Sequence, residues 1–187
     1  MALIQRLGLT RYEADEYYRL ALEAYTKKRD PDTAILHMND AIALLPRNPE
    51  YYAARGLFQM EESNTEAARA DFEQALKLHR YEMLAHYGLG LMAYRAGNWA
   101  EARSRFELAY QCDPKRPETL YCLALAYHRT AHHTGARAFM EQARAAFEAA
   151  GERGRAADAG RWLKEFQKIL NAAAARPGSE RPELPGG

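Results

Sequence analysis

The sequence predicts an all-α fold, an α-solenoid of four helix-turn-helix units followed by a C-terminal capping helix. Three observations carry this prediction. Small and bulky residues recur every 34 positions, each repeat contains two amphipathic segments around a short turn, and prolines fall at the joins between repeats. Four stacked helix pairs of this kind would bury a shared core along the array.

The period of 34 residues appears as columns of small and bulky side chains. Alanine fills two columns, because two antiparallel helices joined by a tight turn must approach closely. A bulky side chain between the alanines fills the remaining space. No insertion is needed in any row, which places the repeats at 15–48, 49–82, 83–116 and 117–150. The columns are Ala34, Ala68, Ala102 and Ala136; Ala41, Ala75, Ala109 and Ala143; and Met38, Phe72, Phe106 and Met140.

Polar residues mark several helix starts. Asp30 and Asn48 each precede a proline, which combines a capping side chain with a residue suited to the first helical turn. Asn98 ends the turn between the two segments of the third repeat and is expected to cap the second. Thr10 and Glu13 have the spacing of a capping box, which indicates another helix start.

The two ends of the chain depart from the repeat. Residues 1–14 are predicted to form a separate N-terminal segment folded against the first helix. Residues 151–175 are predicted to form the capping helix, because large apolar residues recur there at helical spacing. Residues 176–187 are rich in proline, glycine and charge and are predicted to be disordered. The N-terminal apolar residues are Leu3, Ile4 and Leu7, and those of the capping helix include Trp162, Leu163, Phe166 and Ile169.

The third repeat carries a recognisable string. Gly97-Asn98-Trp99-Ala100-Glu101-Ala102 is followed by Phe106, Ala109 and Pro114, and this pattern resembles the tetratricopeptide repeat family. The resemblance covers about residues 15–150. It implies a right-handed superhelix in which the first helix of each pair lines a concave groove, where such proteins usually hold a peptide or helix. The pattern residues build the scaffold and do not name the partner.

A partner-binding groove is predicted on the faces of the first helices that the scaffold does not need. These faces are apolar and aromatic in the second to fourth repeats, whereas the first repeat is charged there, with Glu23 and Lys27 at a helical pairing distance. The alternative is that these residues pack neighbouring helices, or that the termini fill the groove. The predicted groove residues are Leu57, Met60, Leu84, Tyr87, Leu91, Tyr94, Tyr121 and Leu125, with Arg95 and Arg129 at the rim.

Composition argues against several partner classes. Lys and Arg number 26 and Asp and Glu 25, so no charge excess favours nucleic acid or an anionic membrane. No apolar stretch is long enough for membrane insertion. Two cysteines without a CxxC pair suggest reduced thiols in a cytoplasmic protein. Some family members grip a C-terminal carboxylate with Lys, Asn and Arg; the matching positions are Arg19, Glu23, Ala54, Leu84 and Gly88, so this grip is not expected.

No catalytic, cofactor or metal site is predicted. His128 and His132 have the spacing of two ligands on one helix face, with His133 adjacent, but no cysteine or carboxylate nearby completes a set. Cys122 and His128 are six residues apart and fall on different sides of a helix. The chain is therefore predicted to be no enzyme.

Two functions remain at this stage. The first is an adaptor, chaperone or assembly factor that binds a segment of a partner protein in the groove. The alternative is a self-associating scaffold in which the apolar faces meet another copy, giving a homo-oligomer or filament.

Overall fold

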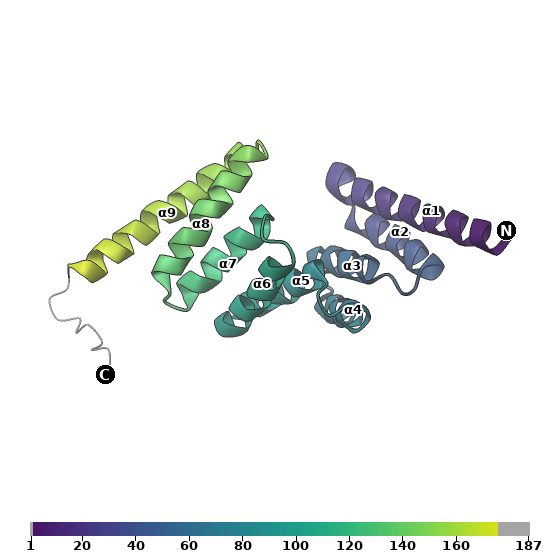
Figure 1. Cartoon of the computed structure of the whole chain (residues 1–187), viewed down its shortest axis with the longest axis horizontal. Coiled ribbons are helices and arrows are strands. Elements are labelled where there is room, and N and C mark those ends of the chain that lie inside the picture. Colours follow the sequence, from purple (N-terminus) through teal and green to yellow (C-terminus); the bar gives the residue numbers. More distant parts are fainter. Residues whose placement is uncertain (1, 176–187) are drawn as a thin grey trace. The chain divides into compact units, whose positions relative to one another are not determined.

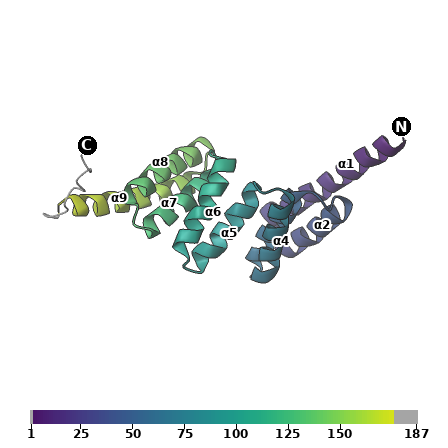
Figure 2. The ribbon, with the colours of Figure 1, turned by 60° about the horizontal axis from the view of Figure 1, so that its bottom comes forward.

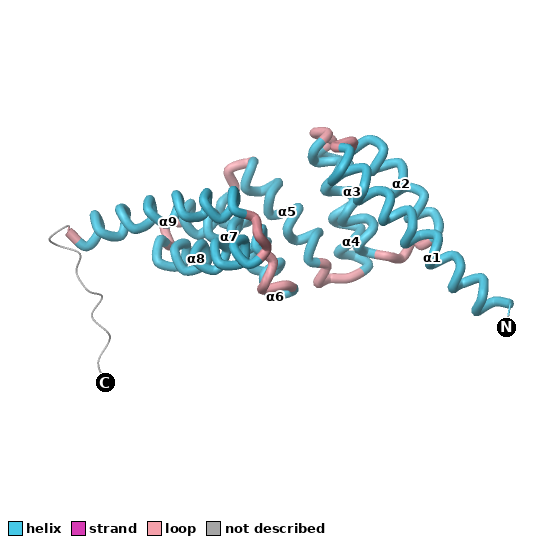
Figure 3. The backbone as a smooth tube through the Cα atoms, turned by 90° about the horizontal axis from the view of Figure 1, so that it is seen from above, coloured by secondary structure: helices cyan, strands magenta, loops and turns pink. Residues whose placement is uncertain are grey.

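The computed structural model describes the backbone of residues 2–175 and the side chains of residues 8–175. The described part consists of helices joined by short loops (Figures 1 and 3). The helices are α1 (Ala2–Glu23), continued by the π-helical turn η1 (Ala24–Lys28), α2 (Pro31–Leu44), α3 (Pro49–Glu61), α4 (Thr65–Leu78), α5 (Met83–Arg95), α6 (Trp99–Cys112), α7 (Pro117–Arg129), α8 (His133–Ala149) and α9 (Arg153–Ala174).

The chain divides into two compact units. The first ends at Pro114 and holds α1 to α6, and the second begins at Lys115 and holds α7 to α9. In the first unit α1 packs on α2, α3 on α4 and α5 on α6, and consecutive pairs meet through α2 with α3 and through α5 with both α3 and α4. The predicted helix pairs are therefore present.

The columns of the repeat form the core of each pair. Ala34, Ala68 and Ala102 are fully buried, as are the rings of Phe72 and Phe106. Glycines provide the space for these rings: a methyl group added at Gly88 would lie 2.2 Å from Cζ of Phe72. Side-chain volume is therefore matched across neighbouring helices, as a close-packed interior requires.

The turns inside the helix pairs share one backbone conformation. Arg29, Ser63, Gly97 and Ala131 all have a left-handed φ, of 54°, 60°, 79° and 63°. Each lies 34 residues after the one before, so the repeat extends to the backbone torsions. This conformation suits glycine, yet glycine is present in one turn of the four. The geometry of the helix pair therefore imposes the turn on residues that do not favour it.

The structure corrects two sequence-based predictions. Residues 2–14 do not form a segment folded against the first helix, because α1 runs without a break from Ala2 to Glu23. Asn98 precedes the first residue of α6 as predicted, but its side chain accepts no capping hydrogen bond from the backbone N–H groups of α6. The predicted caps at Asp30 and Asn48 are confirmed, since their side chains accept from the backbone N–H groups of Thr33 and Glu50 at 3.0 Å.

The second unit is a layer of three helices. Helix α8 packs against both α7 and α9 (Figure 2). The face of α9 that packs on α8 buries Ala156, Ala159 and Phe166, and α8 contributes the buried Phe147. Helix α9 covers α8 where the sequence places the capping helix. The predicted disordered tail, residues 176–187, lies outside the described residues.

Candidate functional site

Helix α5 presents half of the ten predicted groove residues. Leu84, Tyr87, Leu91 and Tyr94 are each half-buried, and Arg95 at the end of the helix is exposed. Leu84 and Leu91 pack against the edge of the core cluster that contains Phe72. These side chains therefore both support the core and present apolar surface at its edge.

The two tyrosines of α5 are held by aromatic neighbours. The ring centre of Tyr87 lies 5.9 Å from that of Phe106, and the ring centre of Tyr94 lies 4.9 Å from that of Trp99 in an edge-to-face arrangement. Both partners belong to α6, the second helix of the same pair. Contacts of this kind fix the ring orientation, so the tyrosines form a preorganised surface.

The two predicted residues on α3 differ in exposure. Leu57 is half-buried and packs against the same cluster as Leu84. Met60 is 6% exposed and belongs to the cluster itself. Met60 therefore lies in the packing between repeats, which is where the alternative interpretation placed such residues.

The remaining predicted residues lie on α7 in the second unit. Leu125 is half-buried and Arg129 is exposed. The hydroxyl of Tyr121 donates a hydrogen bond to a carboxylate oxygen of Asp158 on α9 at 2.5 Å. Burial and this carboxylate raise the pKa of Tyr121, so the phenol stays protonated and remains a donor. Tyr121 thus joins α7 to α9 through this hydrogen bond.

The charged face of the first repeat is occupied by ion pairs. Arg19 bonds to Glu16 at 2.6 Å and to Glu23 at 3.2 Å, and Lys27 lies 3.6 Å from Glu23. The predicted pairing of Glu23 with Lys27 is confirmed. Exposed pairs of this kind contribute little to stability, so they act mainly as a solvated surface.

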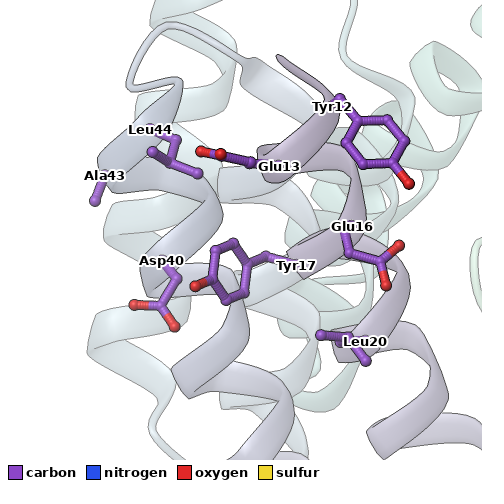
Figure 4. A pocket seen from close by; sticks show the side chains of 8 residues that line it. All are labelled: Tyr12, Glu13, Glu16, Tyr17, Leu20, Asp40, Ala43 and Leu44. Carbon is purple, nitrogen blue, oxygen red and sulfur yellow. The ribbon is translucent and has the colours of Figure 1, made fainter. Parts of the chain in front are cut away.

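A hollow that sequence reasoning missed lies between α1 and α2. It has a volume of about 640 Å³ and combines apolar with acidic side chains (Figure 4). The signal was present in the sequence: apolar residues on the outer positions of both helices, such as Leu36, which no predicted packing requires. The hollow is lined by Tyr12, Glu13, Glu16, Tyr17 and Leu20 of α1 and by Asp40, Ala43 and Leu44 of α2.

The histidines near the turn between α7 and α8 are arranged differently from the predicted pair. His128 Nδ1 lies 3.2 Å from Nδ1 of His133, whereas His132 contacts the carbonyl oxygen of Thr130. His128 also stacks near the rings of Trp162 and Phe166. In the described part of the chain, no group of three or more His, Cys, Asp or Glu residues could hold a metal ion.

The buried His86 and the half-buried His128 make stability depend on pH. Burial lowers the pKa of His86 and of His128, and the neighbouring His133 lowers that of His128 further. Below about pH 6.5 the unfolded chain therefore binds more protons than the folded chain, and the free energy of unfolding falls with falling pH. The slope expected is up to about 1.4 kcal/mol per pH unit for each histidine. Urea denaturation at pH 5 to 8 measures it.

The substitution His128→Phe keeps a ring against Trp162 and Phe166 and removes one titrating group. The urea concentration at the midpoint of unfolding should therefore depend less on pH than in the wild-type chain. The exposed His79 provides the control, since His79→Gln should leave the pH dependence unchanged. A midpoint that does not change between pH 8 and pH 5 in the wild-type chain would contradict this account.

Comparison with known proteins identifies the class. Residues 59–117 match the model of the tetratricopeptide repeat family. Anaphase-promoting complex subunit 3 of Schizosaccharomyces pombe (strain 972 / ATCC 24843) is 23% identical over 128 residues, which cover 68% of this chain and 19% of that protein. The chain therefore spans about a fifth of the length of this relative. These matches and the helix pairs described above show that residues 59–117 carry a tetratricopeptide repeat sequence and that the described part of the chain has the fold of such repeats.

Solved structures agree with this fold. A structure of PilF from Pseudomonas aeruginosa matches with a TM-score of 0.60 and 20% identity, covering 86% of this chain and 82% of that one. A crystal structure of MamA matches with a TM-score of 0.57 and 20% identity over 74% and 81% of the two chains. The first such domain of Spaghetti (RPAP3), bound to an HSP90 peptide, matches with a TM-score of 0.56 and 18% identity over 65% and 95%. The predicted all-α solenoid is confirmed.

The matched repeat and the helix-pair fold suggest a protein-interaction module. None of the described helices is long and apolar enough to cross a membrane.

Proposed function

We propose that this chain is a cytoplasmic adaptor, chaperone or assembly factor that holds an apolar or amphipathic segment of a partner protein against its first helices. The observation that carries the proposal is the composition of α5. Its 13 residues include a single Lys, Arg, Asp or Glu, which is Arg95 at its last position. A helix that is apolar on all sides is either fully buried or reserved for a partner.

The exposure of α5 favours the second case. Its core positions, such as Leu89 and Met92, are buried, but Leu84, Tyr87 and Leu91 on the other positions keep part of their surface open. Tyrosine at such a position is typical of interfaces, because it supplies apolar area and a polar tip, and the leucines beside it add further apolar area. An amphipathic helix or an extended apolar segment fits this surface best.

The proposed binding does not involve the C-terminal carboxylate of the partner. One structural neighbour holds an HSP90 peptide. In the present chain, however, Ala54 is buried and Gly88 lies against the ring of Phe72, so these positions serve packing and offer no cation. The partner is therefore expected to be recognised through side chains along its length.

A pull-down from native lysate, followed by mass spectrometry, tests the proposal. The baits are the wild-type chain, Leu91→Glu and Leu84→Glu, each of which places a charge on the α5 surface. Because a buried or shielded carboxylate is costly in an apolar contact, partner recovery should fall at least about tenfold with either variant. Circular dichroism and thermal melting establish that each bait is folded.

Ser104→Glu is the matched control, since it adds the same charge to an exposed position on α6 of the same helix pair. The partner should be recovered with this bait as with the wild-type chain. Equal recovery of the same proteins by all folded baits would reject the surface. Recovery of the chain's own sequence alone would favour the self-associating scaffold instead.

A further inference from the structure

Exposed apolar side chains are concentrated on the first helix pair. Five large hydrophobic residues of the described part are exposed, and four of them lie on α1 or α2, the fifth being Tyr81. Tyr12 is 71% exposed, Leu36 63% and Leu9 62%. Single exposed apolar residues are ordinary, but a group of them beside a hollow marks an interaction surface.

The hollow between α1 and α2 has the length of a short helix. Its α1 wall runs from Tyr12 to Leu20, which is about 12 Å at the rise of an α-helix, or just over two turns. Leu9 lies one turn before Glu13 on the same face of α1, and Leu36 lies one turn before Asp40 on α2. These two residues extend the apolar surface beyond the ends of the hollow (Figure 4 shows the central part).

The hollow is acidic as well as apolar. Glu13 and Asp40 lie on opposite walls, and neither forms an ion pair with any other described residue. Glu16 is already paired with Arg19 at 2.6 Å. Among the side chains that the structure describes, no Lys or Arg lines the hollow. An occupant must therefore offer an apolar stripe for the floor and positive charge for the two carboxylates on the walls.

Helices already occupy the comparable places inside the first unit. On the sides of the second and third pairs that correspond to the hollow, a helix of the preceding pair is packed: α2 on α3, and α4 on α5. The hollow lies on the side of the first pair that no later helix of this unit covers. A helix from another molecule would bury it in the manner of α2 and α4.

We propose that this hollow is a docking site for an amphipathic helix of a partner protein that carries Lys or Arg on both sides of an apolar stripe. This site is separate from the α5 surface and goes beyond the function proposed above. Apolar anchors of the partner at positions i, i+3 or i+4, and i+7 would reach Tyr17, Leu20 and Leu44, and its cations would reach Glu13 and Asp40.

This chain's own segments suit the hollow less well. The exposed face of α9 carries Arg161, Lys164 and Lys168, but the apolar face of this helix, with Phe166, is already buried against its neighbours. Residues 176–187 hold two arginines and two glutamates and have no net charge. A partner with an uncompensated positive charge is therefore the better match.

Two synthetic helical peptides test the proposal against the full chain by isothermal titration calorimetry. Both are about 15 residues long and share one leucine stripe; the first has lysine beside the stripe and the second has glutamate. The wild-type chain should bind the lysine peptide at least about tenfold more tightly. The double variant Glu13→Lys, Asp40→Lys should reverse this preference, and added salt should reduce it.

The control double variant is Glu66→Lys, Glu73→Lys, which makes the same change of charge at exposed positions on α4. It should bind as the wild-type chain does, and so should Leu91→Glu, which separates this site from the α5 surface. Equal binding of the lysine peptide by both double variants, or no binding by the wild-type chain, would overturn the proposal. So would a wild-type dimer that dissociates on the Glu13 and Asp40 substitutions, since the occupant would then be a second copy.

Discussion

Replacing Asp71 with alanine is expected to lower the free energy of unfolding of the first unit by about 3–5 kcal/mol. Asp71 on α4 is 6% exposed and accepts two hydrogen bonds from the guanidinium of Arg55 on α3, each of 2.7 Å. Arg55 also donates to Asn39 on α2 at 2.7 Å. The ion pair thus connects three consecutive helices.

The large effect follows from what the substitution leaves behind. Arg55 would remain largely buried without its carboxylate, and an uncompensated buried charge costs far more than the pair contributes. The hydrogen bonds to Asp71 raise the pKa of Arg55, so this guanidinium does not lose its proton to escape the cost. The chain must either hold the unpaired cation or open the packing between α3 and α4.

Urea denaturation in a Trp162→Phe background measures the effect, because Trp99 is then the sole tryptophan and reports on the first unit. Glu101→Ala is the control: it breaks an exposed ion pair with Arg105 and should cost under about 1 kcal/mol. The double variant Arg55→Met, Asp71→Leu removes both charges and should recover most of the loss. If the double variant is as unstable as Asp71→Ala, packing rather than the unpaired charge is responsible.

Gly88→Ala is expected to destabilise the first unit by about 1–3 kcal/mol, or more. The added methyl group would lie 2.2 Å from Cζ of Phe72, well inside contact distance. The ring has little room to move, because it also lies so close to Gly56 that a methyl group added there would be 2.7 Å from Cε1 of Phe72. Phe72 is fully buried, so α5 must shift away from α4 to admit the extra carbon.

The control for this prediction is Gly8→Ala on α1, where nothing lies within 4 Å of the added methyl group. Because helices favour alanine over glycine, Gly8→Ala should raise the free energy of unfolding by up to about 1 kcal/mol. Both variants are followed by Trp99 fluorescence in the background used for Asp71. A Gly88→Ala chain as stable as the wild type would show that the seam between α4 and α5 is looser than the structure indicates.

Much of this fold could be predicted because its determinants are local or periodic. The alanine columns and the Asp30 and Asn48 caps set the helix pairs, and the structure confirms them. The start of α1 could not be placed in this way. Thr10 and Glu13 have capping-box spacing, but a capping residue begins a helix only where the residues before it are not themselves helical. No proline precedes Thr10, so nothing in that segment prevents the helix from beginning earlier.

The candidate site was less predictable, because exposure depends on partners distant in sequence. Helical spacing located Leu84 and Leu91 on the open side of α5, and the structure leaves both half-buried. The same spacing could not show that Met60 joins the core cluster, or that Tyr121 meets Asp158, which lies 37 residues later. The hollow between α1 and α2 could not be located from the sequence, because its two walls come from different helices and its size depends on how those helices pack.

The fit of Phe72 between Gly56 and Gly88 also bears on how such arrays change by duplication and loss. In the preceding repeat the corresponding residues are Met38, Leu22 and Ala54, so each junction has its own match of large and small side chains. Deleting one whole repeat would keep the 34-residue register but bring Met38 against Gly88, leaving a gap where the phenylalanine ring had been. The repeats of this chain thus share one backbone conformation but differ in the side chains that meet between neighbouring repeats. Exchanging two repeats would therefore require compensating substitutions on both sides.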